Sequence, residues 1–181
     1  MNSRSHVDQA VNQTQEGTEL CLRFEPPAEL GNSLLDEVEA LIMQGGAVSP
    51  RWVRHNLEQA ALVALALAGP RLVGSVTLKH PRPEYVQRLM RQTGLDLADY
   101  LERGYTAIHR DYRGMGLGTR LVAGLTRQAL GRAIYVVIAT DNLAAEAITR
   151  RCGTRLATRF ISPVTGREYG IWLQGKLPED V

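Results

Sequence analysis

The sequence predicts an α+β protein built on a mixed, mostly antiparallel sheet of six to seven strands, with helices on both faces. The first observation behind this prediction is the order of the segments: β, α, α, β, β, an intervening segment, then β, α, β, α, β and β. The second is a run of alternating glycines between a strand-like and a helix-like segment in the middle of the chain. The third is an ordinary globular composition, with 44% hydrophobic and 22% charged residues.

The first half of the chain is predicted to hold two helices between its first strands. Partial alternation at residues 19–24 indicates a strand, and helical spacing over 27–44 indicates a helix that two glycines end. Ser49 and Pro50 are typical of the N-cap and first position of a second helix. The next two strands, joined by a Gly-Pro turn as a hairpin, are expected at 61–68 and 71–79.

The second half is predicted to alternate strands with helices. Residues 81–102 have helical spacing, in two short amphipathic pieces, and exceed the length of an ordinary loop. The later strands are expected at 105–109, 133–139, 155–161 and 168–173. One later helix is expected to follow the glycine run and end at 129, and another is expected at 142–151. Residues 1–17 are polar without apolar periodicity, so we expect a disordered tail.

Composition and motifs exclude several classes of function. The net charge is only +2 and the arginines are scattered, so no nucleic-acid partner is expected. The longest apolar run, 60–68, is too short to cross a bilayer, and no signal segment opens the chain, so a cytoplasmic protein without a membrane partner is expected. Cys21 and Cys152 lack metal-ligand spacing. We expect two buried thiols in a reducing compartment and no metal site.

The alternating glycines predict an anion site. Gly114, Gly116 and Gly118 stand where the strand gives way to the helix, and the first turn of a helix has amide groups with no partner inside the helix. Such a turn suits phosphate, and Arg113 at its start adds charge. The glycines alone would equally fit a tight connection. Two competing motifs fail, because the third glycine of a dinucleotide fingerprint is replaced by Thr119 and no P-loop lysine follows.

The stretch 113–118, Arg-Gly-Met-Gly-Leu-Gly, resembles the Arg/Gln-x-x-Gly-x-Gly/Ala signature of the GCN5-related N-acetyltransferases (GNAT), and its flanks agree. The resemblance implies that main-chain amides of this loop hold the pyrophosphate of acetyl-coenzyme A. It also implies that the fourth and fifth strands run parallel and splay apart around the pantetheine arm. The cofactor-binding residues it implies are Ile108, His109, Arg113, Gly114, Met115, Gly116, Leu117, Gly118, Thr119, Asn142 and Ala145.

The resemblance also sets the expected domain and partners. We expect one acetyltransferase domain over 18–176, with the helical insert at about 81–102. The insert is interpreted as a lid beside the acceptor site or, equally, as a packing embellishment at the sheet edge. Acetyl-CoA is the expected cosubstrate, and an amine of a small molecule or protein is the expected acceptor. A homodimer is among the assemblies that the resemblance allows.

Catalysis requires a base for the attacking amine and benefits from a donor for the leaving thiolate. Glu102, expected just before the central strand, is the first candidate for the base, with a solvated surface charge as the alternative. The family's tyrosine that faces the sulfur is replaced by Thr149, and a phenylalanine by Thr154. Either the thiolate leaves without assistance, or another residue donates a proton, and Tyr135 is the first candidate for that donor. The two other possible tyrosines are Tyr105 and Tyr169.

Two questions stay open in the sequence. The same threonine substitution motivates an alternative in which the chain binds coenzyme A as a non-catalytic regulator. The acceptor pocket has no distinct motif. Its candidate residues are Trp52, Arg54 and His55 in the second helix, Tyr85 and Arg88 in the insert, and 167–169 in the last hairpin. The arginines among them favour a carboxylate or phosphate on the acceptor.

Overall fold

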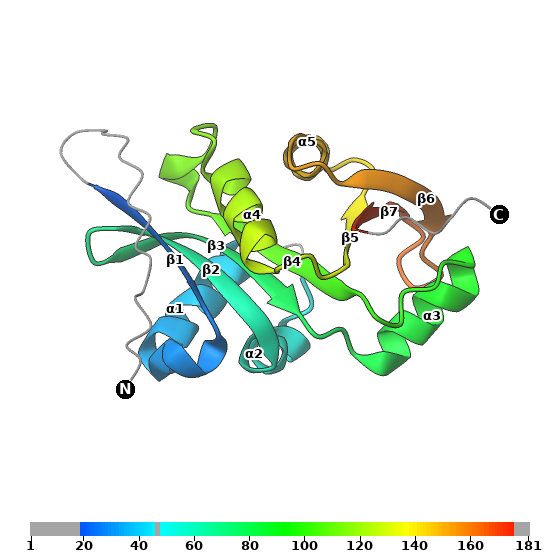
Figure 1. Cartoon of the computed structure of the whole chain (residues 1–181), viewed down its shortest axis with the longest axis horizontal. Helices are drawn as coiled ribbons and strands as arrows, with labels where there is room; N and C mark the ends of the chain where they lie inside the picture. The colour runs from blue at the N-terminus through cyan, green and yellow to red at the C-terminus, as the bar shows by residue number, and fades with distance from the viewer. Residues whose placement is uncertain (1–18, 46–47, 176–181) are drawn as a thin grey trace.

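The computed structural model describes residues 19–45 and 48–175, and it contains one seven-stranded sheet with the strand order β1-β2-β3-β4-β5-β7-β6 (Figure 1). The strands are β1 (Leu20–Glu25), β2 (Ala60–Ala68), β3 (Arg71–Lys79), β4 (Leu101–Ile108), β5 (Ile134–Ala139), β6 (Arg155–Ile161) and β7 (Glu168–Gln174). All neighbouring strands pair antiparallel except β4 and β5, which are parallel. The predicted α+β class and its mixed sheet are confirmed.

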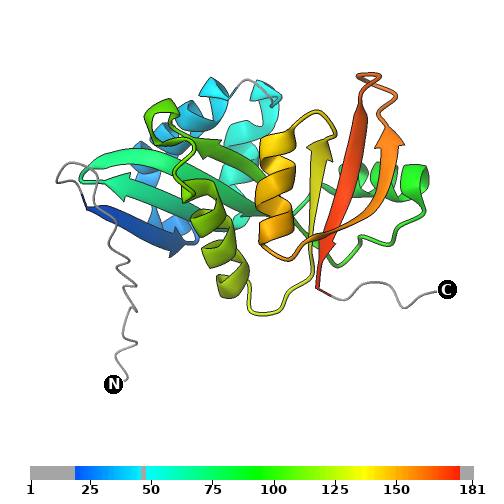
Figure 2. The same cartoon turned by 90° about the horizontal axis from the view of Figure 1, so that it is seen from above.

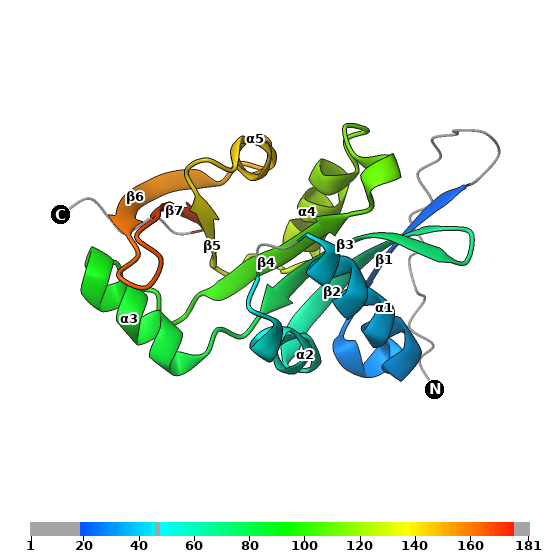
Figure 3. The same cartoon turned by 180° about the vertical axis from the view of Figure 1, so that it is seen from behind.

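Helices cover both faces of the sheet. They are α1 (Gly31–Gln44), α2 (Pro50–Glu58), α3 (Pro83–Thr93), α4 (Leu117–Gln128) and α5 (Leu143–Arg151), with short 3-10 turns at Pro27–Glu29 and Arg110–Tyr112. Figure 2 shows the sheet from above, with α5 over the place where β4 and β5 separate. The view from behind shows α1, α2 and α3 along the lower face, opposite α4 and α5 (Figure 3).

The core has separate parts on the two faces. The apolar stripe of α4, with Leu121 and Leu125, packs on β2 and β3, whereas Val38 of α1 and Val53 of α2 pack on the opposite face. Under α3, Leu89 packs with residues of β5 and β7. The parts of the core thus fix α4 and α3 on either side of the β4–β5 junction.

The two parallel strands separate almost as soon as they pair. β4 and β5 share only the partners Leu101↔Ile134 and Glu102↔Tyr135, so the remaining backbone of β4 has no strand on its β5 side. A bulge in β4 increases the separation. Ser75 pairs with Ala107 and Thr77 pairs with Gly104, so between these two pairs β4 advances by three residues while β3 advances by two. The bulge includes Tyr105, whose φ of 49° is rare for a residue with a side chain.

Several expected boundaries were wrong. β4 begins at Leu101 rather than at residue 105, so Glu102 lies inside the strand and not before it. Pairing of Glu102 with Lys79 of β3 outweighs the poor strand propensity of these charged residues. The first helix begins at Gly31 instead of residue 27. The second amphipathic piece of 81–102 is not helical, because Gly94 ends α3 with a φ of 73° and its N–H bonds to Met90 O at 2.8 Å.

The cysteines were also predicted wrongly in part. Cys21 is exposed on the edge strand β1, and Cys152 is half-buried after α5. No helix within 19–45 or 48–175 has both the length and the apolar character needed to cross a bilayer. The expected tail, residues 1–17, lies outside the described residues.

Candidate active site

A cavity of about 730 Å³ opens where β4 and β5 separate. One wall is the second half of β4 with the glycine loop and the start of α4. The other is β5 with α5. The backbone edge of β4 in this cavity has no strand partner, so an extended ligand with amide groups can pair with it as another strand would.

The glycine loop presents open backbone amides to this cavity. Gly114 and Gly116 have φ values of 77° and 73°, and a Cβ on either glycine would meet no atom within 4 Å. In the part of the chain that the structure describes, no hydrogen-bond acceptor meets the backbone N–H groups of residues 114–119. These N–H groups stand at the N-terminus of α4, where the helix dipole favours negative charge. The loop therefore has the geometry of a phosphate-binding site.

Position 118 requires a glycine for a different structural reason. A Cβ there would lie 2.9 Å from Ile148 Cδ1, so the absence of a side chain lets α4 and α5 approach closely. Arg113 donates from Nε to Ile108 O at 3.0 Å, which anchors the loop on the end of β4. The loop is thus shaped by two separate constraints, helix packing and an open amide surface.

Nine of the eleven expected cofactor-binding residues line the large cavity. They are Ile108, Arg113, Gly114, Gly116, Leu117, Gly118, Thr119, Asn142 and Ala145. His109 and Met115 do not line it. The Nε2 of His109 accepts from Arg71 Nη2 at 2.7 Å, so Nδ1 carries the ring proton and lies 3.4 Å from Asp111 Oδ2, and the ring shapes the turn after β4.

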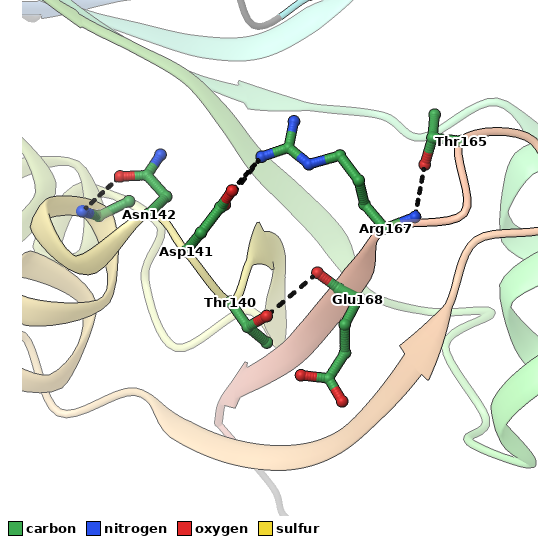
Figure 4. Close-up of polar contacts among 7 residues, drawn as sticks. Thr140, Asp141, Asn142, Thr165, Arg167 and Glu168 are labelled. Carbon is green, nitrogen blue, oxygen red and sulfur yellow. Dashed lines mark hydrogen bonds and ion pairs between the residues drawn. The ribbon is translucent and has the colours of Figure 1, made fainter.

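The far rim of the cavity is held by polar contacts between the β5–α5 turn and the start of β7 (Figure 4). Asn142 Oδ1 accepts from Ala145 N at 3.1 Å and so caps α5. Arg167 Nη2 donates to both carboxylate oxygens of Asp141 at 2.8 Å, and Thr140 Oγ1 donates to Glu168 O at 3.4 Å. These contacts fix the distance across the rim, although the Asp141–Arg167 pair is exposed and contributes little to stability.

Arg103 of β4 is a buried cation that the sequence did not indicate. It is 2% exposed, and its guanidinium donates from Nη2 to Thr149 Oγ1 at 2.8 Å and from Nη1 to Thr154 Oγ1 at 3.4 Å. Burial lowers the pKa of Arg103 to about 10. Thr154 Oγ1 in turn donates to Gln174 Oε1 at 3.2 Å. The two threonines that depart from the family pattern are therefore the partners of one buried arginine.

A second, smaller cavity of about 220 Å³ lies on the α2–α3 side of β4. Its lining includes Glu102 of β4, Trp52 of α2 and Tyr85 of α3. Both cavities are lined by Val48 and by Tyr105 of the β4 bulge, so the two are adjacent beside Tyr105. Its hydroxyl accepts from Asn56 Nδ2 at 2.6 Å, which fixes the ring between them.

Glu102 is the carboxylate at this junction. Its Oε1 accepts from Lys79 Nζ at 3.0 Å, and the side chains are 14% and 8% exposed. The Lys79 ammonium also lies 4.2 Å from the ring centroid of Tyr105. Gly104 makes room for the pair, because a Cβ there would lie 3.1 Å from Lys79 Nζ. The alternative of a solvated surface charge does not describe this carboxylate.

Tyr135 of β5 is the strand partner of Glu102. Its hydroxyl donates to Glu102 Oε2 at 3.4 Å, while the residue is fully buried and lines neither cavity. Burial, and next the negative charge of Glu102, raise the pKa of Tyr135 far above its ordinary value. A phenol in this environment holds its proton, so Tyr135 is placed to orient the carboxylate.

The acceptor candidates divide between the two cavities. Trp52 and Tyr85 line the small cavity, and Arg167 and Tyr169 line the large one. Burial is the main cause that raises the pKa of Tyr85. The remaining candidates line neither cavity: His55, Arg88, Glu168 and Arg54, the last of which is paired with Asp36 and Glu58. Among the residues described, no cluster of three His, Cys, Asp or Glu side chains offers a metal site.

The model of the acetyltransferase (GNAT) family matches residues 33–154, a span that includes the glycine loop, β4, β5 and α5. The chain belongs to this family, whose members transfer acyl groups and use acetyl-CoA as the cosubstrate. No curated protein sequence matches the chain significantly.

Solved structures agree in fold. Arabidopsis thaliana NAA60 in complex with acetyl-CoA is 14% identical, with a TM-score of 0.65, and the alignment covers 86% of this chain and 99% of that one. YncA of Salmonella typhimurium, with its cofactor acetyl-CoA, is 12% identical, with a TM-score of 0.61 and coverages of 91% and 98%. The Escherichia coli ribosomal-protein-S18-alanine N-acetyltransferase is 15% identical, with a TM-score of 0.62 and coverages of 88% and 98%. At these identities the likeness is one of fold.

Proposed function

We propose that this chain is an acetyl-CoA-dependent N-acetyltransferase that transfers the acetyl group directly to an amine. One observation carries the proposal: the open amides of residues 114–119 and the carboxylate of Glu102 lie at two cavities that are adjacent beside Tyr105. The diphosphate would bind the amides at the N-terminus of α4. The pantetheine arm would pair with the free edge of β4, which brings the thioester to the junction.

In this proposal Glu102 receives the proton of the attacking amine. An ammonium has no lone pair for attack, so the proton must leave before the amine attacks or as it does so. The carboxylate faces the small cavity, where the amine would enter, and Lys79 and Tyr135 hold its two oxygens in place. Tyr135, the candidate donor from the sequence, is assigned this positioning role because its buried phenol does not reach the large cavity.

The departing thiolate has no tyrosine at the position that the family uses. Thr149 Oγ1 already accepts from Arg103, and a threonine hydroxyl is a weak acid. We assign final protonation of the thiolate to water that enters the large cavity, whose wall also holds the phenols of Tyr105, Tyr112 and Tyr169. The non-catalytic alternative remains an outcome of the test.

A free-thiol assay with acetyl-CoA and a panel of amines tests the proposal. Transfer predicts thiol release above the rate of hydrolysis without an amine, together with a product heavier by one acetyl group. If acetyl-CoA binds but no amine raises thiol release, the chain is a coenzyme A-binding regulator instead.

A further inference from the structure

The lining of the small cavity includes a positive charge beyond the Lys79–Glu102 ion pair. Lys79 and Glu102 lie 3.0 Å apart and balance each other. Arg82, in the loop between β3 and α3, also lines this cavity, and His80 beside it adds no negative charge. No carboxylate of residues 19–45 or 48–175 forms an ion pair with Arg82. The cavity therefore has one guanidinium without a counter-ion.

Arg82 is also held in place without a counter-ion. Its guanidinium carbon lies 4.2 Å from the ring centroid of Trp52, another lining residue. Stacking on an aromatic ring leaves the N–H edge of a guanidinium open, and this edge fits the two oxygens of a carboxylate. Pro83 begins α3 directly after Arg82, so the backbone at this position is restricted as well. The cation is thus partly preorganised.

The size of the cavity limits what can enter it. Its volume of about 220 Å³ equals the space of roughly seven water molecules at about 30 Å³ each. An amino acid with a modest side chain fits this volume, whereas a folded protein segment does not enter it. Polyamines are also disfavoured, because additional ammonium groups would face Arg82 and Lys79.

We propose that the acceptor is a small amino acid-like molecule, whose carboxylate binds Arg82 while its amine faces Glu102. This inference rests on the proposed N-acetyltransferase activity and adds the substrate class. The amine nitrogen forms a bond to the thioester carbon, and the carbon–sulfur bond breaks. One proton of the ammonium passes to Glu102 before the attack, and Glu102 later releases it to solvent. The second proton leaves the nitrogen as the carbon–sulfur bond breaks, and it passes through water to the departing thiolate of coenzyme A. The products are an N-acetyl amino acid and free coenzyme A.

The test compares common amino acids with their methyl esters and with the matching amines that lack the carboxylate. The wild-type protein is expected to acetylate at least one amino acid with a kcat/KM roughly 10- to 100-fold above its ester, the range of one charge-assisted contact. Arg82→Gln is expected to lose this preference by raising KM for the amino acid, with little change for the ester. Arg82→Lys should restore part of it.

Arg51→Gln is the matched control. Arg51 also stacks on Trp52, at 4.9 Å, but it does not line the small cavity, so the amino acid preference should remain. Thermal melting of both variants establishes that they fold. Equal activity on acids, esters and simple amines, unchanged in Arg82→Gln, would overturn the carboxylate assignment and leave the acetyltransferase standing. Absence of thiol release with every amine would overturn both.

Discussion

Replacing Glu102 by Gln removes the proposed base and keeps the volume of the side chain. General bases contribute about 10²- to 10⁴-fold to a rate, so kcat should fall by at least about a hundredfold. The dissociation constant for acetyl-CoA should stay the same, because Glu102 lines the small cavity and not the large one. The loss should therefore appear in turnover and not in cofactor binding.

The same variant also has a cost in stability. Removing one partner of a fully buried ion pair costs about 3–5 kcal/mol. Here the cost should be nearer about 2 kcal/mol, because the Gln oxygen can still accept from Lys79 and the ammonium keeps the ring of Tyr105 at 4.2 Å. For a domain of this size that lowers Tm by about 4–8 °C. The protein should remain folded at assay temperature.

Thiol release at saturating acetyl-CoA, calorimetric titration of acetyl-CoA and thermal melting measure these three effects. Glu25→Gln is the control, because its pair with Arg23, at 2.7 Å, lies on the edge strand β1, which β2 and β3 separate from β4 and its cavities. It should melt lower without losing turnover. If Glu102→Gln keeps kcat within about threefold of wild type, Glu102 is not the base.

Three further substitutions test the surroundings of the site. Gly104→Ala places a Cβ 3.1 Å from Lys79 Nζ, so it should lower kcat, measured as thiol release at saturating acetyl-CoA, by displacing the ammonium from Glu102. Thr149→Val leaves Arg103 Nη2 without its acceptor, which should cost about 1–3 kcal/mol in a denaturant titration; an unchanged midpoint would show that water replaces the hydroxyl. Gly124→Ala places a Cβ 2.1 Å from Phe24 Cζ and should destabilise by about 1–3 kcal/mol. Melting curves should show rescue by Phe24→Leu, and a stable single variant would refute the packing argument.

The glycine loop could be found in the sequence because all its parts are local. The open amides, the left-handed glycines and the helix start occur within a few residues of one another. The position of Glu102 could not be placed as well, since β4 begins where charged residues pair with β3 and not where the apolar run begins. Strand pairing over a long sequence separation decided that boundary.

Arg103 and Arg82 were missed for the same reason. The threonine partners of Arg103 lie 46 and 51 residues away, and Trp52 approaches Arg82 from another helix. The sequence did contain one useful signal, namely two apolar or aromatic positions of the family that had both become threonine. Two such changes near each other indicate a buried polar partner, although the sequence does not say which residue it is.

Calorimetric titration of acetyl-CoA into Gly116→Trp and Gly131→Trp tests the central claim most directly. Both glycines have left-handed φ, 73° and 76°, with open space around a Cβ, but only Gly116 lines the large cavity, so the backbone strain is matched. The account predicts that Gly116→Trp loses binding while Gly131→Trp binds like wild type. Normal binding by Gly116→Trp would contradict the placement of the diphosphate on this loop.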